Sequence, residues 1–228
     1  LRGGMDASQY KDYVLVLLFV KYVSDKYAGD KKALIEVPSG GSFADMVALK
    51  GNPEIGDKIN QIIGRLAEAN GLKGVIDQAD FNSDEKLGRG KEKVDRLTKL
   101  IAIYENPALD FSSNRAEGDD LLGDAYEYLI GNFAKDSGKS KGNFFTPSEV
   151  SRIMAKVIGI SAETKRSQTI YDPTGGSGSL ILKGADEAPN GLTIYMQEKD
   201  NTTAGLARMN MILHNQPTAE IWNDNTLT

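Results

Sequence analysis

The sequence predicts an α/β protein in which an N-terminal α-helical domain precedes part of a doubly wound parallel sheet. Three observations support this. In residues 169–223, three short runs rich in β-branched and aromatic residues alternate with two helical patterns. A glycine-rich turn follows the first of these runs, whereas residues 1–134 show helical patterns without such an alternation. Strands that alternate with helices form parallel sheets with right-handed crossovers, so we expect a Rossmann-like sheet in the second half.

Residues 1–134 predict a domain of amphipathic helices. Apolar residues recur there at helical spacing, and such stripes most simply form the core of the domain. One of the helical patterns stops at Asn70-Gly71, a typical helix end. The four predicted helices cover residues 5–27, 55–69, 91–104 and 119–133.

Residues 135–142, with the sequence KDSGKSKG, form a polar and basic stretch between the two halves. One interpretation is a flexible linker between the domains. The other is a cationic segment that contacts a phosphate backbone through Lys135, Lys139 and Lys141. The residues themselves leave both interpretations open.

The second predicted domain covers residues 143–228 and begins with a capped helix. Thr146 at the N-cap, Pro147 at the first helical position and Glu149 at the third form a capping box. The helix is expected to pack on the sheet. Its apolar positions are Val150, Ile153, Met154, Val157 and Ile158.

Two adjacent aromatic residues, Phe144 and Phe145, precede this helix in a glycine-flanked loop. One role for them is a hydrophobic staple to the helix. The interpretation that we favour is contact with a bound ligand.

The most informative segment is TIYDPTGGSGSL at 169–180, which reads as a strand, a glycine-rich turn and the start of a helix. We expect glycines here because a ligand that lies directly on the backbone leaves no room for a Cβ atom. The amides at the start of the helix would then point at the ligand, and the helix dipole favours a negative group there.

A second predicted strand, 192–197, ends at Glu198. An acidic residue roughly twenty positions after a glycine turn is well placed to accept hydrogen bonds from ribose hydroxyls. A helix at 201–214 and a third strand at 219–223 complete the alternating series.

Composition excludes several classes of protein. The chain has 228 residues, no cysteine and a single histidine, so neither a disulfide framework nor a thiolate or histidine metal site is expected. The longest apolar run, 13–20, is too short to span a bilayer, and we expect a cytoplasmic protein with no membrane contact. The net charge of −5 argues against non-specific coating of nucleic acid, although a local basic patch could still bind DNA.

Other classes of protein share some of these features. A dinucleotide-dependent oxidoreductase also combines a glycine turn with an acid after the second strand, but its motif is Gly-x-Gly-x-x-Gly, whereas this chain has Gly-Gly-x-Gly. A non-catalytic binding or assembly module is a further alternative.

Taken in order, these segments resemble the modification subunit of type I restriction–modification systems, an N6-adenine DNA methyltransferase family. The resemblance spans nearly the whole chain. The segments that carry it are MDASQYKDYVLVLLFVKYVSD at 5–25, GNFFTP at 142–147, DPTGGSGSL at 172–180, MQEKD at 196–200, NTTAGLARMNMILHN at 201–215 and WNDNTL at 222–227.

The resemblance implies a Rossmann-like methyltransferase domain, incomplete within these residues, that binds S-adenosylmethionine. It implies that the glycine turn contacts the amino-acid part, Glu198 the ribose, and Asn225 or its neighbour Asp224 the adenine. The two phenylalanines would shield the sulfonium from water. The implied cofactor-binding residues are Asn143, Phe144, Phe145, Thr146, Pro147, Ser148, Asp172, Gly175, Gly176, Ser177, Gly178, Ser179, Glu198, Asp224 and Asn225.

The catalytic motif of this family, Asn or Asp followed by Pro-Pro and Phe or Tyr, is missing from residues 1–228. We therefore expect that motif after Thr228, name no catalytic residue, and predict that the chain alone cannot methylate. Because a sheet that stops early exposes a strand edge, we also expect aggregation or an additional chain segment there.

The resemblance also implies partners: double-stranded DNA, a specificity subunit, a restriction subunit with motor and nuclease activity, and a second copy of the modification subunit. The helical domain would clamp DNA and dock other subunits. A stand-alone or fused adenine methyltransferase remains an alternative.

Overall fold

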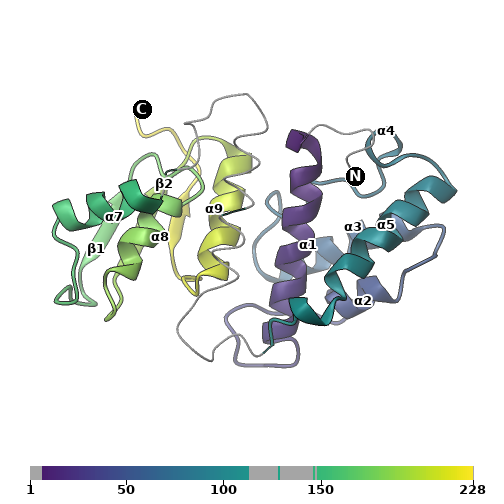
Figure 1. The fold of residues 1–228 in the computed structure, drawn as a ribbon, viewed down its shortest axis with the longest axis horizontal. Coiled ribbons are helices and arrows are strands. Elements are labelled where there is room, and N and C mark those ends of the chain that lie inside the picture. Colours follow the sequence, from purple (N-terminus) through teal and green to yellow (C-terminus); the bar gives the residue numbers. More distant parts are fainter. Residues whose placement is uncertain (1–6, 113–127, 129–145, 147, 228) are drawn as a thin grey trace. The chain divides into compact units, whose positions relative to one another are not determined.

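The computed structural model describes residues 7–112, 128, 146 and 148–227 (Figure 1). The chain divides into two compact units, Leu1–Leu121 and Leu122–Thr228, and each is described by itself. No helix among the described residues is long and apolar enough to cross a membrane.

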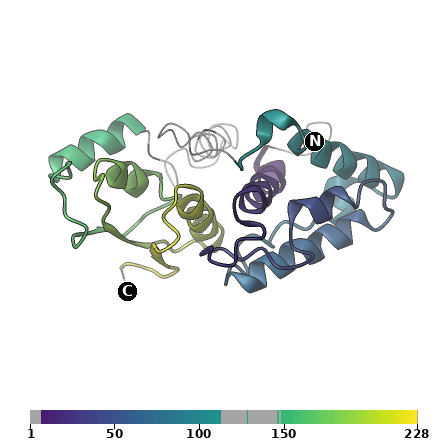
Figure 2. The same cartoon turned by 90° about the horizontal axis from the view of Figure 1, so that it is seen from below.

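The first unit is helical in its described part. Ser42 begins one short helix with a capping box, since its hydroxyl accepts from the Asp45 amide and the Asp45 carboxylate accepts from the Ser42 amide. The elements are α1 (Ala7–Tyr27), α2 (Phe43–Val47), α3 (Ile55–Ala69), α4 (Asp84–Leu87), α5 (Lys91–Tyr104) and the 3-10 helix η1 (Pro107–Leu109) (Figures 1 and 2).

Helix α1 is the centre of this unit. Its residues from Leu15 to Val20 are all buried, which is expected of a helix that is apolar on every side. Two tyrosine hydroxyls tie it to its surroundings: that of Tyr13 donates to the Asp80 carbonyl at 3.0 Å, and that of Tyr104 donates to the Val14 carbonyl at 2.9 Å. Burial raises the pKa of Tyr13 to about 12, so this hydroxyl stays a donor at neutral pH.

The second unit contains a three-stranded parallel sheet in the order β1-β2-β3. Helices follow β1 and β2, as the alternating pattern predicted, and the predicted fold class is confirmed (Figure 1). The elements are α7 (Ser148–Val157), β1 (Thr169–Asp172), α8 (Ser179–Asp186), β2 (Thr193–Gln197), α9 (Asn201–Leu213) and β3 (Glu220–Trp222).

Helices α8 and α9 pack on the same face of this sheet (Figure 2). The core between them and the strands includes Ile181, Ile194, Met196, Met211 and Ile221. Because side chains alternate along a strand, the neighbouring positions face the other side of the sheet. Three aromatic side chains lie on that other side: Tyr171, Tyr195 and Trp222, the last two stacked with ring centroids 5.6 Å apart.

The prediction that the apolar stripe of α7 packs on the sheet was wrong. The side of α7 that packs is small and polar, with Ser151 and Ala155 buried, and these small residues let α7 approach α8 closely. Among the described residues no strand lies beyond β1, and the stripe is exposed. Its members are Val150, Ile153, Met154, Val157 and Ile158, between 45% and 78% exposed.

Candidate ligand-binding site

The carboxyl ends of the three parallel strands meet at one edge of the sheet, the usual place for ligands in open α/β folds. The backbone links these ends. The Glu198 amide donates to the Trp222 carbonyl at 2.9 Å, and Asn223 Nδ2 donates to the Glu198 carbonyl at 2.8 Å. The Thr226 hydroxyl donates to the Pro173 carbonyl, so the segment after β3 reaches back to the turn after β1.

The glycine turn lies at this edge between β1 and α8. The Gly175 amide donates to the Gln197 carbonyl at 2.9 Å, and the Gly178 amide donates to the Gly175 carbonyl at 2.8 Å. Gly176 and Gly178 have φ values of 57° and 82°, which favour glycine, and Gly178 is the N-cap of α8. The turn therefore delivers the chain directly into the helix start.

The reason that we gave for the glycines was incomplete. A Cβ atom on Gly178 would lie 2.7 Å from Cε of Met211, and one on Gly175 would collide with Cε of Met196. Methionine side chains from α9 and β2 thus occupy the space beneath the turn. The close approach of Met196 favours glycine at 175, whatever ligand lies on the outer side of the turn. At 178 the positive φ favours glycine, since the flexible end of the Met211 side chain can move aside.

Glu198 joins two elements of the site. Its Oε2 accepts from the Gly176 amide at 3.1 Å, and its Oε1 accepts from the Asp200 amide at 2.8 Å. Asp200 in turn caps α9, since its Oδ1 accepts from the Thr203 amide at 2.8 Å. A carboxylate offers about four lone-pair positions, so Glu198 can still accept two hydroxyl hydrogen bonds.

Asp172 ends β1 and lies partly buried beside the turn. Burial raises its pKa above the usual value, the hydrogen bond from the Thr174 amide at 3.0 Å lowers it, and the nearby Glu198 charge raises it further. No described Lys or Arg forms an ion pair with Asp172 or Glu198. Among the described residues, the negative charge at this edge therefore has no cationic partner, which favours a cationic or hydroxyl-bearing ligand.

The segment after β3 supplies two further predicted residues. Asp224 is exposed and Asn225 is half-buried. The Asn225 amide donates to Asp224 Oδ1 at 2.7 Å, and the Leu227 amide donates to Asn225 Oδ1 at 3.3 Å. Both residues belong to the segment that Thr226 connects to the turn after β1.

The structure brings together the predicted residues from Asp172 to Ser179, Glu198 and the Asp224-Asn225 pair. Thr146 is half-buried, and Ser148 is the first residue of α7. The predictions that lie outside the described residues are Asn143, Phe144, Phe145, Pro147, Lys135, Lys139 and Lys141, together with most of the predicted helix 119–133.

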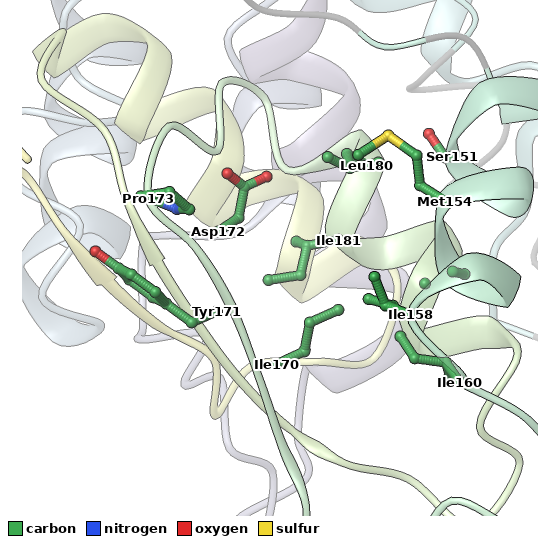
Figure 3. Close-up of a pocket in the computed structure, with 12 residues that line it drawn as sticks. Ser151, Met154, Ile158, Ile160, Ile170, Tyr171, Asp172, Pro173, Leu180 and Ile181 are labelled. Atoms are coloured by element: carbon green, nitrogen blue, oxygen red, sulfur yellow. The ribbon is translucent and has the colours of Figure 1, made fainter.

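An apolar groove of about 260 Å³ lies between α7, β1 and α8 and was not predicted (Figure 3). Asp172 and Pro173 lie at its polar end, next to the glycine turn. The row of apolar residues in the sequence of α7 was the signal that could have indicated this groove. Its apolar lining includes Met154, Ile158, Ile160, Ile170, Leu180 and Ile181.

A second feature that the sequence reasoning missed is a buried polar residue of α9. Asn210 Nδ2 donates to the Ser177 carbonyl at 3.1 Å, and the hydroxyls of Ser177 and Ser179 lie 2.9 Å apart. The signal was a polar residue inside an apolar helical pattern. Asn210 holds the turn from the protein side.

The donor and acceptor groups at this edge fit a ligand of mixed charge. The first amides of α8 can donate to a negative group, because helix starts have no intrahelical acceptor for them. Asp172 and Glu198 can accept from a cationic group and from hydroxyls. Among the described residues, no three carboxylate or imidazole groups gather into a metal site.

Family models match most of the chain. Residues 1–103 match the HsdM N-terminal domain, and residues 117–228 match the N-6 DNA Methylase family. The type I restriction enzyme MpnII methylase subunit of Mycoplasma pneumoniae is 31% identical over 100% of this chain and 51% of its own length. The MjaVIII methylase subunit of Methanocaldococcus jannaschii is also 31% identical, over 94% of this chain and 40% of its own length. The chain thus spans about half the length of the first of these relatives and less of the second.

Two solved structures are also similar to this chain. The type I restriction-modification system methyltransferase subunit from Streptococcus thermophilus has a TM-score of 0.83 and 28% identity, over 99% of this chain and 56% of that one. A structure from Vibrio vulnificus, at a TM-score of 0.57 and 16% identity, shares the fold. The protein belongs to the family of type I restriction enzyme methylase, or modification, subunits.

Proposed function

We propose that this chain is the cofactor-binding part of a DNA adenine-N6 methyltransferase subunit in a type I restriction–modification system. The subunit would transfer a methyl group from S-adenosylmethionine to adenine, in a site chosen by a specificity subunit. The observation that carries the proposal is the gathering of the glycine turn, Asp172 and Glu198 at one edge of a parallel sheet, in a chain of this family.

The groups at the edge suit the parts of S-adenosylmethionine, which supplies the methyl group when bound. The first amides of α8 would bind the carboxylate, and Asp172 would attract the ammonium group. Glu198 would accept from the ribose hydroxyls with the lone pairs that Gly176 and Asp200 leave open. Asn225, with Asp224 beside it, would read the adenine edge.

The segment before α7 would close the site. In the proposal, Phe144 and Phe145 exclude water from the sulfonium, and the neighbouring Asn143, Thr146, Pro147 and Ser148 line the same side. Lys135, Lys139 and Lys141 would contact the DNA backbone. These roles extend the family resemblance to residues of this chain.

The methyl-transfer residues would lie in a part of the family's sequence that this chain does not cover. No adjacent prolines occur in residues 1–228, and Asp172-Pro173 runs into Thr174. The edge of β1 that no described strand pairs with and the apolar groove beside α7 support this, since both can receive a further strand with apolar side chains. We therefore assign no catalytic residue and propose that this chain alone is inactive.

Partners follow from the same proposal. Double-stranded DNA, a specificity subunit, a restriction subunit and a second modification subunit would assemble with the full subunit. The helical domain, with the boundaries proposed at 1–134, would clamp DNA and dock these partners. The target adenine would leave the duplex to reach the methyl group, at a cost of a few kcal/mol.

The test is methyl transfer from labelled S-adenosylmethionine to duplex DNA, followed by nucleoside analysis. We expect N6-methyladenine when the subunit at the length of its relatives acts with its specificity subunit, and no transfer by residues 1–228 alone. Methylcytosine as the product would overturn the adenine assignment. Transfer by residues 1–228 alone would overturn our placement of the catalytic residues.

A further inference from the structure

Asn210 is a polar residue in the middle of α9, and its side chain is 0% exposed. Its neighbours Ala207 and Met211 lie directly beneath the glycine turn, within 3.8 Å and 2.7 Å of where a Cβ atom on Gly178 would be. Apolar residues would fill this position without the cost of burying an amide. A buried amide at this place therefore requires an explanation.

The amide makes one contact with the turn. Its Nδ2 donates to the Ser177 carbonyl at 3.1 Å, which fixes that carbonyl toward the protein interior. Its Oδ1 is also buried, and within the described part of the chain it has no hydrogen-bond partner. Asn210 thus keeps a polar group in the core for the sake of a single hydrogen bond to the turn.

The residue that it holds is flanked by two glycines. Ser177 lies between Gly176 and Gly178, whose φ values of 57° and 82° are in the left-handed region. Because glycine adopts positive and negative φ about equally well, the peptide between Ser177 and Gly178 could rotate at little steric cost, at the expense of the hydrogen bond from the Gly178 amide to the Gly175 carbonyl. After such a rotation the Ser177 carbonyl would face the ligand side, beside the first amides of α8.

We propose that Asn210 is a positioning residue for the cofactor carboxylate. It holds the Ser177 carbonyl inward, so the surface that faces the ligand presents N–H groups and no carbonyl oxygen. A carbonyl oxygen there would repel a negative group, whereas helix-start amides attract one. This inference rests on the proposed function, because it assumes that the ligand's amino-acid part lies against the turn.

The inference predicts a selective effect on ligands. S-adenosylhomocysteine has the amino-acid carboxylate, whereas methylthioadenosine has the same adenine and ribose without it. In Asn210→Leu and Asn210→Asp, affinity for S-adenosylhomocysteine should fall about tenfold or more, the size of one lost hydrogen bond to a buried group. Affinity for methylthioadenosine should change less than about threefold.

The test is calorimetric titration of both ligands into residues 1–228 and into the two variants. The control is Ile194→Val, a conservative change of a buried residue on β2 that takes no part in the hydrogen bond to the Ser177 carbonyl. It should leave the ratio of the two affinities unchanged. If the wild-type chain binds neither ligand, the proposed function fails; if it binds both and the Asn210 variants weaken both equally, or neither, the positioning role is overturned.

A measurement on the unmodified chain covers the case in which the variants do not fold. The side-chain amide signals of Asn210 in nuclear magnetic resonance spectra should shift when S-adenosylhomocysteine binds and stay in place when methylthioadenosine binds. Equal shifts with both ligands, or none with either bound ligand, would contradict the inference.

Discussion

The helical unit and the sheet unit differ in what they leave exposed. Among the described large apolar side chains, the helical unit exposes Leu34 and Ile103. The sheet unit exposes the whole stripe of α7 and, on the sheet, Tyr171 and Trp222. Large exposed apolar patches usually mark surfaces that another chain or segment covers. Among the described residues, the sheet unit thus exposes more large apolar side chains than the helical unit.

The charged groups of the two units also differ in whether they have partners of opposite charge. In the helical unit, the buried Lys93 ammonium donates three hydrogen bonds, to the Asn82 carbonyl at 2.9 Å, to Asn82 Oδ1 at 2.8 Å and to Asp84 Oδ1 at 2.8 Å. At the sheet edge, burial and the nearby Glu198 charge raise the pKa of Asp172, and neither carboxylate forms an ion pair with a described Lys or Arg. Uncompensated charge of this kind is typical of functional sites.

The largest expected effect is on the core of the helical unit. Phe19 is completely buried in α1, so Phe19→Ala should lower the free energy of unfolding by about 3–5 kcal/mol. The single tryptophan, Trp222, lies in the sheet unit and reports on that unit alone. Denaturation should therefore show an earlier circular dichroism transition and an unchanged fluorescence transition. Equal shifts of both signals would mean that the two units unfold together; Ile103→Ala, on an exposed side chain, is the control.

The glycine turn should show the next largest effect. Gly178→Ala places a Cβ atom at a positive φ, costing about 1–2 kcal/mol, and displaces the flexible end of Met211, which adds less than the φ term. Gly191→Ala is the matched control, because Gly191 has a φ of 80° and no atom within 4 Å of its Cβ position. Fluorescence-detected denaturation should separate the two variants. Equal destabilisation would show that backbone strain, and not packing on Met211, requires glycine at 178.

Asp172→Asn should raise the stability of the chain at pH 7 and lower its affinity for S-adenosylmethionine. Because the folded-state pKa is raised, the charged carboxylate is disfavoured in the folded protein, and stability falls as pH rises through that pKa. The variant keeps an acceptor for the Thr174 amide and loses the charge near Glu198. It should be more stable than the wild type at pH 7 and equal to it when Asp172 is protonated.

Its affinity for S-adenosylmethionine should drop about tenfold, the size expected for one charge-assisted contact. Denaturation at both pH values and calorimetric titration check the two parts. A variant that is less stable at pH 7 would contradict the pKa argument.

The smallest effect is expected on the exposed stripe of α7. Val157 is 78% exposed, so Val157→Lys should change the free energy of unfolding by about 0.5 kcal/mol or less. The same change should reduce self-association, measured by light scattering, because it interrupts an apolar surface. Ala155→Lys in the same helix should instead be strongly destabilising, since Ala155 is 2% exposed. Unchanged self-association in Val157→Lys would argue against the stripe as an open surface.

The sequence predicted those elements whose signals are local. The bounds of α3 and α5 match the predicted segments, because both have regular apolar stripes and α3 stops at Asn70-Gly71. The short helices α2 and α4 were missed, since four or five residues show no period. Local pattern and end signals thus decided what could be predicted of the fold.

The candidate site was predictable where a local sequence pattern is enough to suggest a residue, as for Asp172, Glu198 and the glycine turn. It was not predictable where distant segments meet. Met196 and Met211 fill the space beneath the glycines, and Asn210 contacts Ser177 across 33 residues of sequence. The orientation of α7 also depends on its neighbours, because its small buried side faces α8 and its apolar stripe stays exposed.

The most direct test of the account is calorimetric titration of residues 1–228 with S-adenosylmethionine, beside Glu198→Ala and with NAD as the control ligand. Glu187→Ala, a carboxylate at the far end of α8, is the matched variant. We predict that the wild type and Glu187→Ala bind S-adenosylmethionine, that Glu198→Ala loses binding, and that NAD does not bind. Equal binding of S-adenosylmethionine by Glu198→Ala, or preferential binding of NAD by the wild type, would contradict the assignment of this sheet edge as the methyl-donor site.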